Sequence, residues 1–324
     1  MRTRLILHIG MHKTGSSAIQ RFLSRNRWVL GKLGIAYPHS LGPTGQRQPK
    51  HNAIFAAISH QADNGRPHPD LGPAATLIEA TAAEIERAAP RTAILSAEGF
   101  SGERPIFARA LRPLANRFDV RVVVFLRRRD LWVESFYKQM VQSHDVAETR
   151  PFHDFLQADS TRRHMDYLTI LNWWAEAFGQ DAIIVTPFEA SAGEPVHLFL
   201  AAAGLSPRLA YLPFSRGAVN VSCSAETTEI LRLANKDGRH ATKAETARIE
   251  GTIAPRQGAF LTKVERAEIN APFVDDDAEI MRRFTPRNRD RLFADISGHS
   301  RSEKWAGFAP DDPRRALIRH VSSG

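Results

Sequence analysis

The segment 5–23, LILHIGMHKTGSSAIQRFL, constrains the fold of this chain more than any other stretch. Its first five residues form an apolar run typical of a buried strand, and a helical apolar pattern resumes at Ile19. Between the two, Gly10 and Gly15 bracket a loop of small and polar residues. A strand, a glycine-containing loop and a helix N-terminus together bind anionic phosphate esters. Glycine permits close backbone approach, and the first-turn N–H groups and the helix dipole attract negative charge.

The loop departs from the P-loop pattern GxxxxGK[ST], in which a lysine directly follows the second glycine. Here Ser16 occupies that position, and Lys13 lies inside the loop. Lys13 can still reach the bridging oxygen of a bound anhydride and neutralise the leaving group there. The alternative is an ordinary strand–helix turn with a solvated lysine. The run of small and hydroxyl residues from Thr14 to Ser17 at the helix start favours the anion site.

The composition is that of an ordinary globular protein. The chain has 324 residues, 43% hydrophobic and 24% charged, which suffices for one large domain or for a core with appended pieces. No apolar run approaches the roughly 18 residues of a membrane span. Cys223 is the only cysteine, which leaves no internal disulfide and fits a reducing compartment. A removable signal peptide would destroy the phosphate loop, so we expect a cytoplasmic protein.

The formal net charge of +9 indicates anionic ligands, and nucleic acid is one alternative. However, the basic residues are dispersed, and the short basic runs at 127–129 and 314–315 lack interleaved aromatic residues. We therefore interpret the charge as support for an anionic cofactor, with an anionic acceptor as an option, and expect no nucleic-acid partner.

Two further apolar runs, Thr92–Ser96 and Val120–Leu126, indicate core strands of a parallel sheet. The first leads to Glu98, and a carboxylate at the carboxyl end of a core strand lies where α/β sheets bind ligands. Glu98 could instead cap the following helix or pair with an arginine. The second run leads to three arginines that begin at Arg127. Guanidinium groups bind phosphate bidentately, and three at a strand end are costly unless an anion neutralises them.

The pattern strand, GxxK[ST]G[ST][ST], helix is similar to the 5′-phosphosulfate-binding loop of sulfotransferases that use 3′-phosphoadenosine-5′-phosphosulfate (PAPS). A second segment resembles the same family. There, a strand end supplies an arginine, and a serine eight residues later completes a clamp on the 3′-phosphate. Arg127 and Ser135 have this spacing. The resemblance covers roughly residues 4–205.

The resemblance implies an α/β fold with a P-loop-like, three-layer architecture. We expect a parallel sheet of about four to five strands flanked by helices, with helical C-terminal additions. The chain would form a single domain over 1–324, with a core of about 4–205 and a helical part of about 206–324. Phe188 resembles an aromatic residue that lies near the adenine in the family. The family's C-terminal Arg-Lys-Gly phosphate contact has no obvious copy here. The cofactor-binding residues implied are His12, Lys13, Thr14, Gly15, Ser16, Ser17, Arg127, Ser135 and Phe188.

The implied reaction moves a sulfuryl group from PAPS to a hydroxyl or amine of a small-molecule or glycan acceptor and leaves 3′-phosphoadenosine-5′-phosphate (PAP). Lys13 would stabilise the bridging oxygen. Glu98 is the first choice of general base, and His51 is the second because a loop histidine titrates near neutral pH. No metal is expected, since no acid is placed to hold magnesium beside the loop.

Two other functions remain open at this point. A P-loop-type small-molecule kinase would share the strand, loop and helix, and a non-enzymatic nucleotide-binding module would lack an acceptor cleft and a base. The identity of the acceptor and the oligomeric state are not determined by the sequence.

Overall fold

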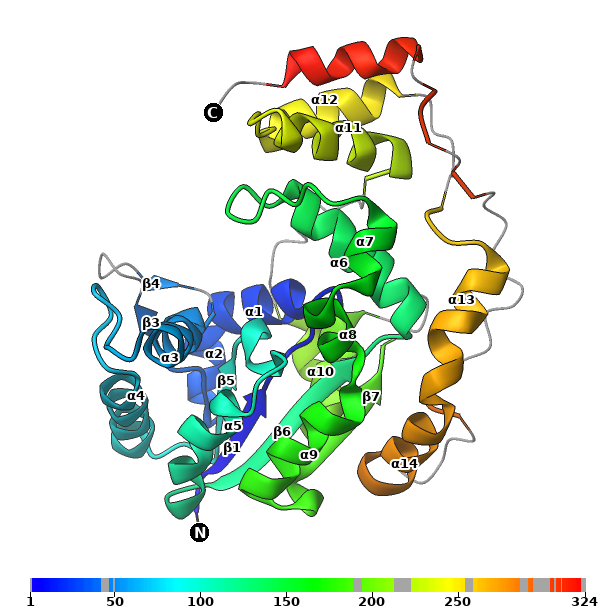
Figure 1. Ribbon diagram of the computed structural model, residues 1–324. Coiled ribbons are helices and arrows are strands. Elements are labelled where there is room, and N and C mark those ends of the chain that lie inside the picture. Colours follow the sequence, from blue (N-terminus) through cyan, green and yellow to red (C-terminus); the bar gives the residue numbers. More distant parts are fainter. Residues whose placement is uncertain are drawn as a thin grey trace. The chain divides into compact units, whose positions relative to one another are not determined.

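Figure 1 shows a computed structural model of the chain, in which the described residues are 2–41, 47–48, 50–188, 194–212, 223–253, 259–285, 291–293, 304–305, 307–309 and 311–321. The chain divides into two compact units, each assembled from separate stretches. The first comprises Met1–Arg127, Asp166–Arg216 and Asp275–Phe293, and the second comprises Arg128–Met165, Gly217–Val274 and Ala294–Gly324. The stretch Arg128–Met165, from the middle of the chain, groups with later helices in the second unit. A single domain over 1–324 stays a prediction.

The first unit is built on a five-stranded sheet in the order β2-β5-β1-β6-β7, with every pair parallel. The predicted parallel α/β sheet is thus confirmed. From β1 the chain fills one side of the sheet with β2 and β5, and it then crosses to β6 and β7 on the other side. The connections reverse around β1, and open α/β sheets bind ligands at such a switch point. The strands are β1 (Arg4–His8), β2 (Ile35–Ala36), β5 (Thr92–Ser96), β6 (Asp119–Leu126) and β7 (Ile183–Pro187).

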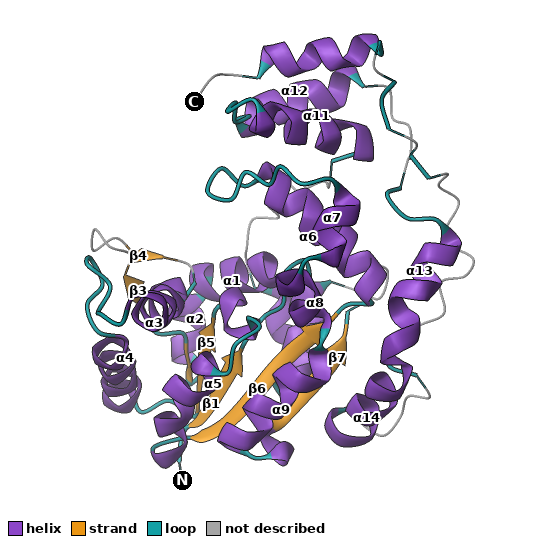
Figure 2. Cartoon of the chain, in the orientation of Figure 1, coloured by secondary structure: helices purple, strands orange, loops and turns teal. Residues whose placement is uncertain are grey.

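Helices cover both faces of this sheet (Figure 2). On one face, α1 (Ser16–Arg25) and α10 (Pro195–Ala202) contribute to a core that includes Ile6 of β1 and Val123 of β6. On the other face, α9 (Tyr167–Phe178) packs against β6 and β7. Burial on both faces explains why the central strands are almost continuously apolar.

The remaining elements of the first unit connect these layers. A two-stranded antiparallel sheet of β3 and β4 precedes α3, and α4 follows. Their bounds are α2 (Arg27–Lys32), β3 (Ser40–Leu41), β4 (Arg47–Gln48), α3 (Asn52–Asn64), α4 (Ala74–Ala88), α5 (Ile106–Leu111) and α14 (Val274–Phe284, of which Val274 groups with the second unit), with 3₁₀ turns at Glu98–Ser101, Arg112–Asn116, Gln180–Ala182 and Pro207–Tyr211.

The second unit is helical in its described part. A buried charge network joins two of its helices. Arg266 donates to Asp130 at 3.2 Å and to Glu134 at 2.6 Å, and Arg128 and Asn270 also donate to Asp130. The helices are α6 (Arg129–Gln142), α7 (Phe152–Gln157), α8 (Asp159–Met165), α11 (Ala225–Lys236), α12 (Lys243–Thr252) and α13 (Lys263–Asn270), with 3₁₀ turns at Ala271–Phe273 and Pro313–His320. Across the described residues, no helix is both long and apolar enough to span a bilayer.

Candidate anion-binding site at the carboxyl edge of the sheet

The loop after β1 needs glycine at both ends. Gly10 has a φ of 58° and Gly15 a φ of 82°. A Cβ on Gly10 would lie 2.8 Å from the Cα of Glu98, and a Cβ on Gly15 would lie 2.5 Å from Cγ of Pro195. At both positions the backbone is left-handed and a neighbouring residue lies too close for a Cβ. Only glycine meets both conditions without a steric cost.

Lys13 adopts the same left-handed region, with a φ of 68°. For a residue with a side chain this conformation costs about 1–2 kcal/mol, so its surroundings must hold it in place. Its backbone N–H faces the Glu98 carboxylate and acts to lower the pKa of that group. Its backbone C=O accepts a long hydrogen bond from Nη1 of Arg127, at 3.4 Å. The residues that follow β1, β5 and β6 thus meet at the two peptide groups of Lys13.

The N-terminus of α1 carries the features of an anion site. Gly15 is its N-cap, no side chain caps it, and its first turn contains no acidic residue. Thr14 is used within the loop, where its hydroxyl donates to the Met11 carbonyl at 2.7 Å. The Ser16 hydroxyl is buried and has no hydrogen-bond partner among the described residues, whereas Ser17 is exposed. The free N–H groups of the uncapped helix start and the unsatisfied Ser16 hydroxyl can all donate hydrogen bonds to the oxygens of a bound anion.

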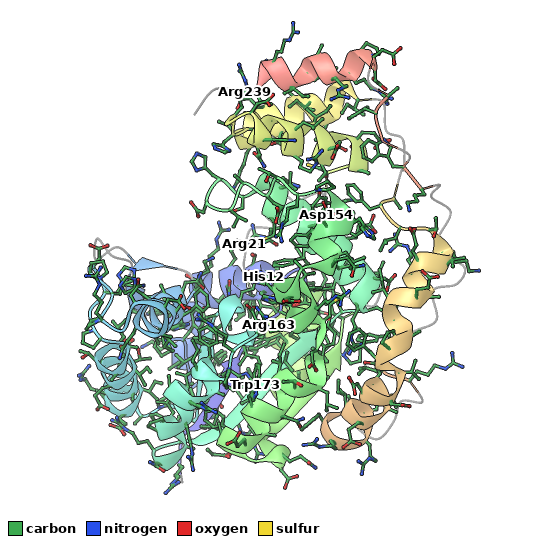
Figure 3. All side chains as sticks on the ribbon, in the orientation of Figure 1. His12, Arg21, Asp154, Arg163, Trp173 and Arg239 are labelled. Carbon is green, nitrogen blue, oxygen red and sulfur yellow. The ribbon has the colours of Figure 1, made fainter. Side chains whose placement is uncertain are left out.

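Glu98 lies beside this loop with 19% of its side chain exposed. Burial raises the pKa of its carboxyl group, and the charges of Lys50 and Lys13 and the Lys13 backbone N–H oppose that rise. Nδ1 of His12, which Figure 3 labels, lies 3.6 Å from Oε1 of Glu98. A carboxylate with a raised pKa next to an anion cradle is suited to accept a proton during a reaction.

Lys50 belongs to this site, although the sequence pattern gave it no role. The backbone N–H of His51 donates to the Ser96 carbonyl at 2.9 Å, and the Ser96 N–H donates to Nδ1 of His51 at 3.1 Å. These bonds fix the segment that begins at Lys50 against the end of β5, where its charge acts on Glu98. Nothing local in the sequence signals this pairing, because it joins residues 45 positions apart.

His51 is a structural residue in this arrangement. Its ring is 1% exposed, and while Nδ1 accepts from Ser96, Nε2 donates to the Pro38 carbonyl at 3.2 Å. Burial lowers the pKa of His51 to about 4. A ring with both nitrogens engaged could take a proton only by giving up one of these bonds. The geometry therefore favours Glu98 over His51 as the base.

The three consecutive arginines have separate environments, which corrects the expectation that an anion must neutralise all of them. Arg128 forms a bidentate pair with the buried Asp130, with N–O distances of 2.7 and 2.8 Å. Arg129 is buried, and its guanidinium lies 4.1 Å from the centroid of the Phe273 ring. Arg127 is the member of the run whose guanidinium reaches the loop after β1.

The other two residues implied by the resemblance lie in different units. Phe188 follows β7, and its ring lies beside the loop, with Cε2 3.6 Å from the position a Cβ would take on Gly15. Ser135 is partly buried on α6, in the second unit. A clamp of Arg127 and Ser135 on a 3′-phosphate stays a prediction.

Comparisons with known proteins add little to this description. No known family profile matches the chain. An uncharacterised protein of Archaeoglobus fulgidus is 27% identical over 179 residues, which are 51% of this chain and 45% of that protein, so the match spans less than half of the relative. The crystal structure of a sulfotransferase from Alicyclobacillus acidocaldarius aligns with 67% of this chain and 85% of its own, with 16% identity and a TM-score of 0.42. A TM-score this low does not establish a common fold.

Proposed function

We propose that this chain is a sulfotransferase that moves a sulfuryl group from PAPS to a hydroxyl or amine of a small-molecule or glycan acceptor. The observation that carries the proposal is the meeting of three strand ends at Lys13. Its strained peptide contacts both Glu98 and Arg127, beside an uncapped helix N-terminus. This brings a cation, a carboxylate with a raised pKa and a guanidinium to one anion cradle.

The residues of the cradle divide the work of binding the donor. The N–H groups at the start of α1 would hold the 5′-phosphosulfate, and the Ser16 hydroxyl would donate to it. Arg127, with Ser135 of α6, would bind the 3′-phosphate, and Phe188 would lie against the adenine, as the resemblance implies. PAPS itself supplies the activated sulfuryl group.

Lys13 and Glu98 would act on the two ends of the transfer. As the acceptor oxygen bonds to sulfur, the bond from sulfur to the bridging oxygen breaks, and its electron pair stays on the 5′-phosphate of PAP. The Lys13 ammonium stabilises this growing negative charge. Glu98 accepts the proton that the acceptor loses, so it must be deprotonated at the start of each turnover.

The nucleotide preference of the full chain tests the proposal. Thermal shift with PAP, adenosine 5′-phosphate and ATP plus magnesium should show the largest stabilisation with PAP. Greater stabilisation by ATP plus magnesium would instead support a small-molecule kinase. Tight PAP binding with no sulfuryl transfer to any of a panel of alcohols, amines and sugars would indicate a non-enzymatic binding module.

Substitution of Arg127 then tests the 3′-phosphate contact. Arg127→Ala should weaken PAP binding by about 2–4 kcal/mol, as expected for loss of a charge-assisted bidentate contact, and should leave adenosine 5′-phosphate nearly unaffected. Arg121→Ala is the matched control, because Arg121 lies on β6, the strand that Arg127 follows, and is 39% exposed. Equal losses for both nucleotides would refute the assignment.

A further inference from the structure

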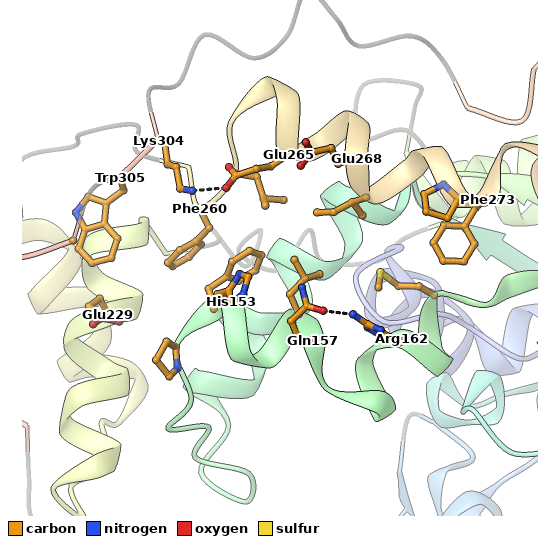
Figure 4. A pocket seen from close by; sticks show the side chains of 18 residues that line it. His153, Gln157, Arg162, Glu229, Phe260, Glu265, Glu268, Phe273, Lys304 and Trp305 are labelled. Carbon is orange, nitrogen blue, oxygen red and sulfur yellow. Dashed lines mark hydrogen bonds and ion pairs between the residues drawn. The ribbon is translucent and has the colours of Figure 1, made fainter.

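A cavity of about 870 Å³ lies within the second unit, and none of its lining residues comes from the first (Figure 4). Aromatic rings form one wall. The Phe152 and Phe260 rings stack with centroids 5.0 Å apart, and Trp305 meets Phe260 edge-on at 6.1 Å. Leu156 of α7 and Ile269 of α13 extend the apolar lining. Lining residues such as His153, Gln157 and Glu268 are exposed, so the cavity opens to solvent, and its volume lies in the range of small-molecule sites.

The charged groups that line the cavity are largely paired with other protein groups. Glu265 forms an ion pair with Lys304, and Glu229 forms one with Arg232 at 2.6 Å. Arg162 donates a hydrogen bond to the side chain of Gln157. Charges that already satisfy one another leave little attraction for a charged ligand, and burying an uncompensated charge beside aromatic rings is costly.

Backbone hydrogen bonds fix two residues of the aromatic wall, Phe260 and Trp305. The Phe260 N–H donates to Glu134 at 3.0 Å, and Glu134 is bound by Arg266 at 2.6 Å in the buried network of α6 and α13. The Trp305 N–H donates to the Ala259 carbonyl at 2.8 Å, which fixes the tryptophan beside Phe260. A wall fixed in this way does not have to be ordered when a ligand binds, and such preorganisation favours affinity.

From this arrangement we infer that the cavity binds an uncharged small molecule with a flat, apolar ring body. The aromatic wall provides stacking surface for the rings. The Glu229 and Glu265 carboxylates are already paired with cations, so they can offer the polar end of the ligand hydrogen bonds but no uncompensated charge. Glu268, an exposed carboxylate in the lining, is the group a cationic ligand would use, so a cation is the main rival. The inference does not depend on sulfuryl transfer.

A series with one ring body and three head groups tests the inference on the full chain without nucleotide. The ligands are 2-naphthylmethanol, 2-naphthoate and 2-naphthylmethylammonium, each titrated by calorimetry. We expect the alcohol to bind about tenfold more tightly than either ion, because each ion must keep or replace the hydration of its charge. Tighter binding of the ammonium or the carboxylate would overturn the inference, and so would no binding of the alcohol.

Two variants of α13 locate the binding. Ile269→Trp places a larger side chain in the cavity and should weaken the binding of the alcohol by at least about tenfold. Val264→Trp makes the same substitution on the same helix at a residue that is 66% exposed and does not line the cavity, and it should leave the affinity unchanged. A photoreactive diazirine analogue of the alcohol checks the same point in the unmodified chain. Its label should fall in 151–165, 229, 260–273 or 304–307, and a label confined to other peptides would refute the site.

Discussion

The left-handed backbone of Lys13 allows its conformational role to be separated from its charge. Lys13→Ala and Lys13→Gly both remove the ammonium, but only glycine relieves the φ of 68°. Relief is worth about 1–2 kcal/mol, from which glycine loses about 0.5–1 kcal/mol through its more flexible unfolded state. Lys13→Gly should therefore be more stable than Lys13→Ala by up to about 1.5 kcal/mol. Urea unfolding of the two variants under identical conditions measures this difference.

The rate of turnover should depend on the Lys13 ammonium and not on the backbone conformation at position 13. Both variants should lose about 10²–10³ in the rate of sulfuryl transfer, the loss typical when a group that stabilises developing negative charge is removed. Their affinity for PAP should fall much less, because the charge develops mainly during transfer. Ala89→Gly is the matched control, since Ala89 is also left-handed, with a φ of 41°, at the end of α4. It should gain stability with turnover unchanged. A glycine variant at 13 that is less stable than the alanine variant would refute the strain argument, and near-normal turnover in either would refute the catalytic role.

Three further outcomes follow from charges and burial. The Lys50 charge lowers the pKa of Glu98, so Lys50→Met should raise that pKa and move the acidic limb of the pH–rate profile to higher pH. The control Lys32→Met, on α2, should leave the limb unchanged. Because burial lowers the pKa of His51 from 6.5 to about 4, the unfolded chain binds its proton first as the pH falls. His51 should thus contribute about 3 kcal/mol to a loss of stability between pH 7 and 4, and the loss in urea titrations should be smaller by that amount in His51→Gln. Arg266→Met leaves the buried Glu134 without its cation, while Asp130 keeps Arg128, and it should cost about 3–5 kcal/mol in unfolding free energy. A loss below about 1 kcal/mol would mean that the pair of Arg266 and Glu134 adds no more than a surface pair.

The sequence predicts the sheet and the loop well, because both are local patterns. The strand Thr92–Ser96 is observed with the bounds that its apolar run predicts, and Gly10 and Gly15 take the conformations for which glycine is the usual residue. The α1 face that begins at Ile19 is buried as its spacing predicts. A continuous apolar run and a 3.6-residue period are both visible in a few adjacent positions, so they can be recognised without tertiary information.

Contacts between distant segments are not predictable in this way. From the sequence, His51 is a candidate base because it is a histidine in a predicted loop. In the structure, however, its two ring nitrogens hydrogen-bond the Ser96 N–H and the Pro38 carbonyl. Lys50 has no signal of its own, and it enters the site through the anchoring of its neighbour. The grouping of α6 with later helices likewise depends on buried charges, such as Arg266 with Asp130, that lie 136 positions apart in the chain.

The unusual position of the lysine in the loop has a steric explanation. In the P-loop pattern the cation follows the second glycine, but here that position is Ser16, which is 1% exposed. Its Oγ lies only 3.1 Å from the place a Cβ would take on Gly10. A lysine side chain at 16 would have to start from this buried position beside Gly10, at the cost of overpacking. Position 13 is partly exposed instead, and there a cation can reach a bound anion if the backbone accepts a left-handed turn. The contacts of Glu98 and Arg127 with the Lys13 peptide stabilise that turn, so the groups proposed for proton transfer and phosphate binding also fix the residue proposed to stabilise the leaving group.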